Sequence, residues 1–127
     1  MTYFFAKTLD LPLLQGIEQV TEALKQRGFG VLTRIDVSDT LREKIGAEFR
    51  PYVILGACNP RMAHQALLVE DKVGTMLPCN VIVQEVDGKS EVAAVDPVAS
   101  MQAIDNASLA AVAAKVREEL KAMIEAL

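Results

Sequence analysis

The sequence predicts a single α+β domain over residues 1–127, in which one mixed, mainly antiparallel sheet carries its long helices on one face. Three observations predict this fold. Short apolar runs typical of strands alternate with segments whose apolar residues recur every three or four positions, as in amphipathic helices. A chain of 127 residues is long enough for one hydrophobic core and short for two domains. Finally, Asp87-Gly88 lies between two apolar runs, which indicates a tight hairpin and therefore an antiparallel pair of strands.

The N-terminal quarter of the chain predicts a strand followed by a helix. Residues 1–7 are aromatic and apolar and predict the first strand, after which Asp10 and Pro12 are residues that favour a helix start. A single apolar stripe follows, and Gly28 stands where a left-handed helix cap is expected. The stripe comprises Leu13, Ile17, Val20 and Leu24.

The next segment predicts a second strand and a short helix. Residues 31–37 alternate between apolar and more polar side chains, which is typical of a half-buried strand. Thr40 and Glu43 have the spacing of a capping box. We therefore expect a short helix over residues 41–45 that Gly46 ends.

The strongest local signal is a corner between a strand and a helix. Residues 52–58 form a short and almost wholly apolar run, as expected of a buried central strand. Asn59 is a favoured N-cap residue, and Pro60 suits the first position of a helix. The following residues present an apolar helix face made of Met62, Ala63, Ala66 and Leu67.

The second half of the chain predicts a loop, a hairpin and a long helix. Residues 71–78 contain Gly74 and Pro78 and predict a loop, and strands over 80–86 and 90–95 flank the hairpin turn. Asp96-Pro97 ends the second of these strands, and Asn106 or Ser108 is placed to cap the last helix. That helix has one apolar face, made of Leu109, Val112, Val116, Leu120 and Ile124.

Charge and motifs exclude several classes of function. The net charge of −4 and the pI near 5.0, with scattered basic residues, argue against a nucleic-acid-binding surface. Neither a secretory signal nor an apolar run of about 20 residues is present, so we expect a cytoplasmic protein with no membrane segment. The glycine-rich motifs of common nucleotide-binding proteins are absent. No catalytic constellation is recognisable, and the sequence implies no particular cofactor.

Cys58 is the residue best placed for chemistry. It directly precedes a helix N-terminus, whose N–H groups and positive dipole end favour a thiolate. The alternative is that Cys58 is a small apolar residue that closes a buried strand, a role common for cysteine. Cys79 begins the next strand and would lie beside Cys58 if the two strands are neighbours. Their spacing matches no short dithiol motif, so a functional pair is the weaker interpretation.

His64 is the only histidine, and in the predicted helix it lies four residues after Pro60. From there it could lean toward the two cysteines and, with Met62 or Met76 nearby, complete a soft-metal site. A histidine on a polar helix face is more often a solvated surface group, and tetrahedral zinc would still lack a fourth protein ligand. The leading interpretation is therefore that these residues bind no metal.

The segments Tyr52-Val-Ile-Leu-Gly-Ala-Cys-Asn-Pro60 and Leu77-Pro-Cys-Asn80 together resemble the Domain of Unknown Function 302 family. The resemblance covers nearly the whole chain. It implies a TATA-binding-protein-like β-α-β(4)-α arrangement with inserted helices, and it implies homodimers. It implies no reaction, ligand or catalytic residue. The two matching motifs fall on the same cysteine-bearing corner that the residue chemistry selects.

These observations predict a small binding or interaction protein, a homodimer that holds a small-molecule ligand. The candidate ligand-binding residues are Cys58, Asn59, Pro60, His64 and Cys79. Two alternatives stay open: a thiol-dependent redox or sulfur-handling protein in which Cys58 reacts and Cys79 is its partner, and a soft-metal binder that uses both cysteines with His64.

Overall fold

The fold is built on a five-stranded antiparallel sheet with the strand order β1-β5-β4-β3-β2. The structure is a computed structural model that describes residues 2–127. The strands are β1 (Phe4–Leu9), β2 (Gly30–Asp36), β3 (Tyr52–Cys58), β4 (Cys79–Val86) and β5 (Lys89–Val95). The helices are α1 (Leu13–Gln26), α2 (Val37–Ile45), α3 (Pro60–Val69), α4 (Pro97–Ser100) and α5 (Ala107–Glu125), with a 3₁₀ turn, η1, at Val73–Met76. The α+β class predicted from the sequence is confirmed.

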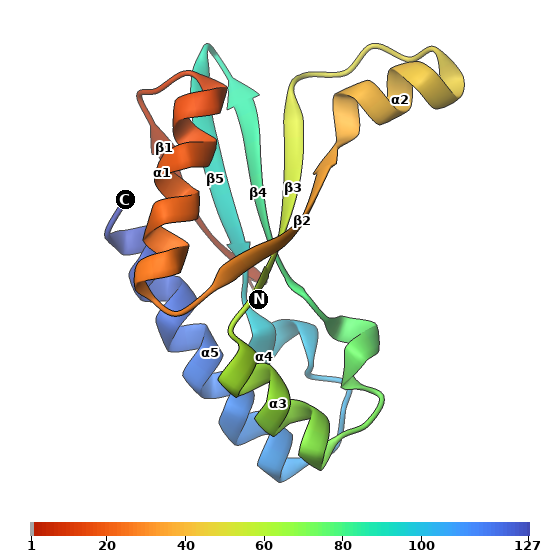
Figure 1. Cartoon of the computed structure of the whole chain (residues 1–127), viewed down its shortest axis with the longest axis vertical. Helices are drawn as coiled ribbons and strands as arrows, with labels where there is room; N and C mark the ends of the chain where they lie inside the picture. Colours follow the sequence, from red (N-terminus) through yellow and green to blue (C-terminus); the bar gives the residue numbers. More distant parts are fainter. Residues whose placement is uncertain (1) are drawn as a thin grey trace.

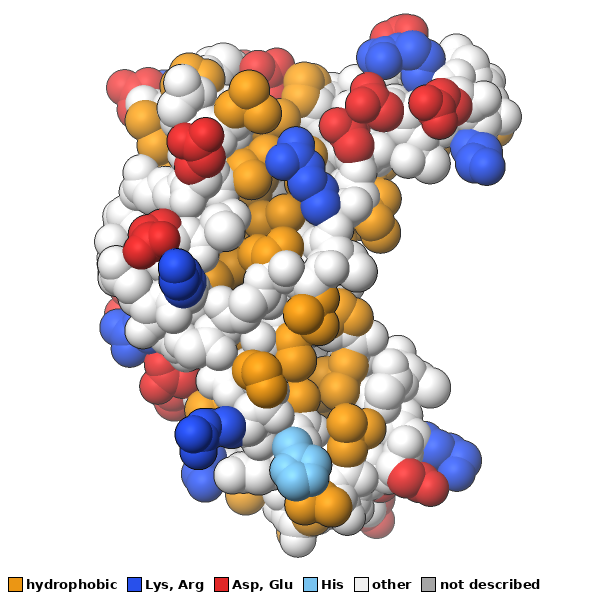
Figure 2. All heavy atoms as spheres, in the orientation of Figure 1, with side chains coloured by type: hydrophobic (Ala, Val, Ile, Leu, Met, Phe, Trp, Pro, Cys, Tyr) orange, Lys and Arg blue, Asp and Glu red, His pale blue; other side chains and the backbone are white. Residues whose placement is uncertain are grey.

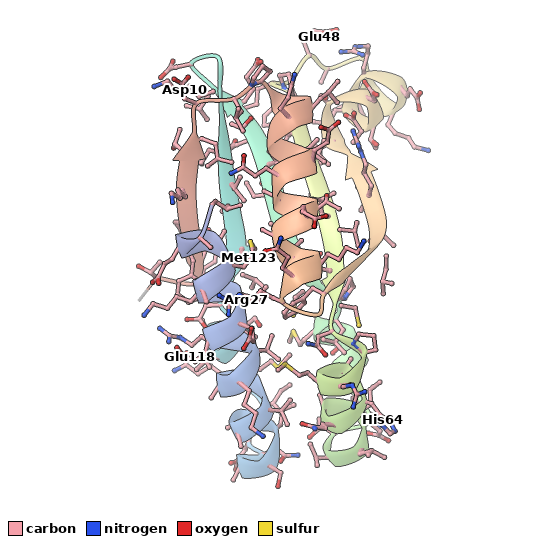
Figure 3. The ribbon with its side chains drawn as sticks, turned by 60° about the vertical axis from the view of Figure 1, so that its left-hand side comes forward. Asp10, Arg27, Glu48, His64, Glu118 and Met123 are labelled. Carbon is pink, nitrogen blue, oxygen red and sulfur yellow. The ribbon has the colours of Figure 1, made fainter. Side chains whose placement is uncertain are left out.

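The two long helices, α1 and α5, lie on the same face of the sheet (Figures 1 and 3). Alternate residues of each strand point toward them, because successive side chains of a strand face opposite sides. The main core therefore lies between one sheet face and two helices. Its fully buried members include Val20, Leu24, Val53, Leu55, Val81, Val83, Val92, Ala94, Leu120 and Met123.

Helix α5 runs past the end of the sheet, where α3 and α4 pack against its projecting half and η1 packs against α3 (Figure 1). This second group of elements has a small core of its own. Its buried members are Ala66, Val73, Met101, Leu109 and Ala113. We call this part of the molecule the lower lobe. The end of the sheet that carries Cys58 and Cys79 faces it.

The start of α1 differs from expectation, and its end does not. Helix α1 begins at Leu13, its N-cap is Pro12, and no side chain caps it, so Asp10 does not serve as the cap. At the other end, Gly28 adopts φ +82°. The N–H groups of Gly28 and Phe29 donate to the carbonyl oxygens of Lys25 and Leu24 at 3.0 and 2.9 Å, which is the Schellman arrangement expected of a glycine after a helix.

Strand β1 covers Phe4–Leu9, so it starts and ends later than the predicted segment 1–7; Met1 lies outside the described residues. Strand β2 is an edge strand whose side chains are mostly exposed, so the alternation in residues 31–37 does not reflect a half-buried strand. The expected burial of β2 fails because the tertiary position of a segment decides its burial, which local periodicity does not report.

Helix α2 is real, but its predicted start is wrong. It begins at Val37, and the Asp36 carboxylate accepts from the Asp39 N–H at 3.1 Å. The Thr40 hydroxyl donates to the Asp36 carbonyl oxygen instead of capping a helix. An aspartate at the end of β2 outcompetes the capping-box pattern because Asp is a stronger N-cap than Thr. The end of α2 is as predicted, with Gly46 in a left-handed conformation at φ +66°.

The remaining elements agree closely with those predicted from the sequence. Asp87 and Gly88 both adopt positive φ, at 52° and 75°, as a two-residue hairpin turn of type I′ requires. Asn106 caps α5 by accepting from the Leu109 N–H at 3.0 Å. The loop expected over residues 71–78 contains the short turn η1. Within residues 2–127, no helix is both long and apolar enough to cross a membrane.

Candidate functional site

The site is built on the corner where β3 passes into α3. Strand β3 ends at Cys58, α3 begins at Pro60, and the Asn59 side-chain oxygen accepts from the Met62 N–H at 3.2 Å. The corner predicted from the sequence is therefore present, with Asn59 as the N-cap and Pro60 in the first turn. Gly28 lies against it: a Cβ added there would come within 3.1 Å of the Asn59 side-chain nitrogen.

Cys79 lies next to this corner because β4 is the neighbour of β3. In the register of the two strands, Cys79 is opposite Ala57, one residue before Cys58. Both cysteines are free thiols, and Cys79 is buried whereas Cys58 is partly exposed. The two cysteines therefore lie at the same end of the sheet, on neighbouring strands. Because successive side chains of a strand alternate between faces and Cys79 is paired with Ala57, the Cys58 and Cys79 side chains start out from opposite faces.

Cys58 and Cys79 are both among the residues that line a cavity between the end of the sheet and the lower lobe, which we call the corner cavity. It encloses about 40 Å³, and its wall is almost wholly apolar. It lies between the main core and the small core of the lower lobe, and both contribute to its wall. The lining residues are Phe29, Ala57, Cys58, Asn59, Met62, Ala63, Ala66, Leu77, Pro78, Cys79, Pro97, Met101, Leu109, Val112, Ala113 and Val116.

The environment of Cys79 favours a neutral thiol. Burial, and to a smaller extent the nearby Cys58 thiol, together raise the pKa of the Cys79 thiol to about 11. A charged thiolate is disfavoured there because the apolar wall solvates it poorly. Cys79 therefore keeps its proton at neutral pH, unlike the thiol of a nucleophile activated by a helix end.

His64 and Pro60 belong to the same corner but do not line the cavity. His64 is exposed, and it projects from the side of α3 that faces away from α5 (Figure 3). It stands at the surface of the lower lobe (Figure 2). Among residues 2–127, no three His, Cys, Asp or Glu side chains gather where they could hold a metal ion. The structure therefore brings Cys58, Asn59 and Cys79 together and leaves His64 apart from them.

The family model for the domain of unknown function DUF302 matches residues 5–127. The chain belongs to the DUF302 family. The crystal structure of an uncharacterized conserved DUF302 protein from Bacillus stearothermophilus is similar to this chain at 30% sequence identity. The two structures agree with a TM-score of 0.92, over 98% of each chain. No curated protein matches this sequence.

In this DUF302 chain, part of the cavity wall was not predicted from the sequence. Pro97 begins α4, Met101 directly follows α4, and Ala113 lies in α5, so all three come from segments far along the chain from the corner. One signal points to them: Asp96-Pro97 repeats the pattern of Asn59-Pro60, a capping residue and a proline after a strand. Asp96 accepts from the Val98 N–H at 3.0 Å, so both prolines begin helices that border the lower lobe.

The chemistry available in the corner cavity of this DUF302 chain is narrow. Apart from the two thiols, the described lining residues contribute no ionisable side chain. Asn59 is the only other polar residue among them, and its side-chain oxygen already caps α3. The wall therefore offers apolar contact and sulfur, a combination that suits binding better than acid–base catalysis.

Proposed function

We propose that this protein is a cytoplasmic small-ligand-binding protein whose site is the corner cavity. The observation that carries the proposal is that residues of two separate sequence motifs, Cys58 and Cys79 among them, line one apolar cavity at the junction of two cores. A largely preformed apolar cavity with few polar groups is the usual form of a ligand site.

The size of the cavity limits the ligand. A water-sized volume requires roughly 10 to 15 Å³ by the same measure, so an enclosed volume of about 40 Å³ accepts an ion or a molecule of a few heavy atoms. A drug-sized or nucleotide ligand would require the lower lobe to move away from the sheet. The proposal therefore concerns small, weakly hydrated ligands.

The direct test is stabilisation by ligands. Small apolar and sulfur-containing compounds are screened for an increase in the midpoint of thermal unfolding, because a ligand that binds only the folded chain must stabilise it. Ala63→Leu fills the cavity from α3, and Ala66→Val is a milder filling change on the same helix. Ala114→Leu, at an exposed position of α5, is the matched control.

We expect the stabilising compounds to lose their effect in Ala63→Leu and in Ala66→Val and to keep it in Ala114→Leu. If no compound in a broad panel stabilises the wild-type protein, the proposal is wrong. Stabilisation that survives both filling changes would place the ligand elsewhere and would equally contradict it.

A thiol-dependent redox function is the second candidate, and the observation that favours it is that both cysteines are among the residues that line one cavity. In such a function, a hydroperoxide would oxidise Cys58 and Cys79 to a disulfide by accepting two electrons. The two thiol protons would leave with the reduced oxidant, which becomes water and an alcohol. The neutral state of Cys79 weakens this candidate, because the attacking form of a cysteine is the thiolate. Rapid, stoichiometric formation of a disulfide with peroxide, detected by mass spectrometry, would support the redox function.

Alkylation of Cys58 at a rate no faster than that of a free thiol would contradict the redox function.

We also infer that the protein forms a homodimer through the face of the sheet opposite α1 and α5. In the residues that the structure describes, no helix crosses this open face (Figure 1). A groove of about 350 Å³ runs over it and contains a single charged residue, Glu91, whose carboxylate accepts from the Gln84 amide at 2.8 Å. Aromatic and aliphatic side chains with little charge are typical of the centre of an interface. The groove is lined by Tyr3, Phe4, Tyr52, Asn80, Ile82, Gln84, Glu91, Ala93, Ala94 and Val95.

A further inference from the structure

The open face of the sheet, opposite α1 and α5, carries one apolar row that crosses all five strands. The strand register places the members of this row directly opposite one another, and opposed residues of an antiparallel pair share a face. Ile82 and Ala93 line the groove on the open face, which fixes the side of the sheet for the whole row. In order across the sheet, the row consists of Ile35, Ile54, Ile82, Ala93 and Ala6.

This apolar row is bulky on one side of its centre and small on the other. The central strand, β4, contributes Ile82, the strands β2 and β3 contribute isoleucines, and β5 and β1 contribute alanines. A partner surface of even height would leave a gap over the alanines, and such gaps lose dispersion contacts. The surface that fits the open face is therefore one with the same relief in reverse order.

A second copy of the same face supplies the reversed relief about one of two possible twofold axes. An axis parallel to β4 exchanges the two halves of the sheet, so Ile54 of one copy packs over Ala93 of the other. By the same operation, Ile35 packs over Ala6. An axis at right angles to β4 would instead stack isoleucine on isoleucine and alanine on alanine. Only the axis parallel to β4 lets the two rows interdigitate as packed sheets require.

The polar row beside the apolar row selects the same axis. Tyr52, Gln84 and Glu91 are opposed in register, and the Glu91 carboxylate accepts from the Gln84 amide at 2.8 Å. The axis parallel to β4 brings Glu91 to Tyr52 of the second copy, whose hydroxyl can donate to it. Arg50, two residues before Tyr52, brings a positive charge to the same end of the sheet. The perpendicular axis would place Glu91 on Val95, and burial of a carboxylate without a donor is costly.

The open face is large enough for a stable dimer. It is formed by five strands of six to eight residues. At a strand spacing of about 4.8 Å and a rise of about 3.3 Å per residue, these strands present a flat area of roughly 550 Å². Two such faces together bury about 1,100 Å², which reaches the roughly 1,000 Å² expected of a specific interface.

We infer that two copies of this chain pack open face to open face about a twofold axis parallel to β4, with Ile54 of each copy against Ala93 of the other. The inference rests on the proposed homodimer and adds its symmetry and the residues that determine its fit. Ile82 meets its own counterpart at the axis. Specificity for a second copy then comes from a bulky side chain and the small one that receives it.

The test exchanges the two sizes and measures the dimer dissociation constant by analytical ultracentrifugation. Ala93→Ile sets bulk against bulk and Ile54→Ala leaves a gap, so each change is expected to weaken dimerisation by about tenfold or more. The variant with both changes should recover most of the affinity, because large again faces small. Strand β4 separates the two residues within one chain, so recovery reports contact between chains. Ala114→Ile, at an exposed position of α5, adds the same bulk elsewhere and should change nothing.

A second measurement uses the unaltered protein and therefore does not depend on how well the variants fold. In a mixture of ¹³C-labelled and unlabelled chains, isotope-filtered NMR spectra should show contacts between the Ile54 and Ala93 methyl groups of different chains. Contacts that join Ile54 to Ile54 would assign the perpendicular axis and overturn the inference. A double variant that dimerises no better than the weaker single variant would also overturn it.

These outcomes are distinct from failure of the homodimer itself. A wild-type protein that is monomeric contradicts both proposals. A dimer that Ile82→Lys disrupts, but in which Ile54 and Ala93 show neither recovery nor contact between chains, contradicts only the inferred axis.

Discussion

At the scale of single residues, the two cysteines of the corner differ because of their depth. Cys79 begins a central strand and is 8% exposed, whereas Cys58 is partly exposed at the end of β3. Their adjacency could be anticipated from the sequence, since each lies at the end of an apolar run. The burial of Cys79 could not, because it depends on α3 and α5, which close over it from distant parts of the chain.

The raised pKa of Cys79 makes stability depend on pH. Burial raises this pKa from 9.0 to about 11, so between these values the folded chain keeps a proton that the unfolded chain loses. The free energy of unfolding must then fall as pH rises through this interval, by up to about 3 kcal/mol. Chemical denaturation of wild type and Cys79→Ala at about pH 8 and about pH 11 measures the difference. Cys58→Ala should retain most of the fall, because burial is its larger cause. An identical pH dependence in wild type and Cys79→Ala would contradict this account.

Gly56 allows the strand that follows the cis Leu77-Pro78 bond to lie close to β3. A Cβ at Gly56 would lie 2.8 Å from the Pro78 ring and would overlap the Thr33 hydroxyl. We expect Gly56→Ala to destabilise the protein by about 1 to 3 kcal/mol through overpacking. Gly30→Ala, on the adjacent strand and with no atom within 4 Å of its new Cβ, is the control. Equal urea-unfolding midpoints for the two variants would show that Gly56 has no such steric role.

At the scale of elements, sequence reasoning succeeds where one residue fixes the local backbone. Asn59 with Pro60 and Asp87 with Gly88 each set a helix start or a turn on their own, so the corner and the hairpin were predictable. The start of α2 was not, because Asp36 and Thr40 both offer a cap and the capping-box spacing pointed to Thr40, the weaker N-cap of the two. The first and last residues of strands such as β1 were also predicted wrongly, because the partner strand determines where pairing stops.

Asn106 connects two elements of the lower lobe. Its side-chain oxygen caps α5, and its amide nitrogen donates to the Val69 carbonyl oxygen at 2.8 Å, at the end of α3, and to the Glu70 carboxylate at 3.2 Å. We expect Asn106→Ala to cost about 2 kcal/mol, more than the roughly 1 kcal/mol expected for Asn59→Ala, which has the cap bond alone. Thermal unfolding of both variants shows which one loses more stability.

Asn106→Asp keeps the cap and loses the two donated hydrogen bonds, so its stability should lie between those of Asn106→Ala and wild type. A larger loss in Asn59→Ala would contradict the bridging role.

At the scale of the whole molecule, the sheet has one covered face and one open face. The sequence predicted that the long helices share one face of the sheet. Helices α1 and α5 each carry a single apolar stripe, and an apolar sheet face can bury both stripes. It did not locate the corner cavity, since the cavity exists only where the main core meets the lower lobe. Met101 and Ala113 approach Cys58 through packing between distant segments, which no local pattern encodes.

The open face predicts the oligomeric state. We expect wild type to elute with twice the 13.8 kDa mass of one chain when size-exclusion chromatography is coupled to light scattering. Ile82→Lys places a charge in the middle of the groove and should shift the protein to the monomer, because a buried unpaired charge opposes association. Leu68→Lys, at a residue of α3 that is 72% exposed and off the sheet face, should leave the dimer intact. A monomeric wild type, or a dimer in Ile82→Lys, would place the interface elsewhere or remove it.

The central claim is that the corner cavity is open to a ligand, and methionine methyl signals in ¹³C NMR spectra under xenon pressure test it most directly. Xenon is an apolar probe of internal cavities. Met62 and Met101 line the cavity, whereas Met123 is buried in the main core and Met76 is exposed. The account predicts saturable shifts of the Met62 and Met101 signals and stationary Met76 and Met123 signals. Stationary Met62 and Met101 signals, or equal shifts of all four, would show that the cavity is only a packing gap between two cores.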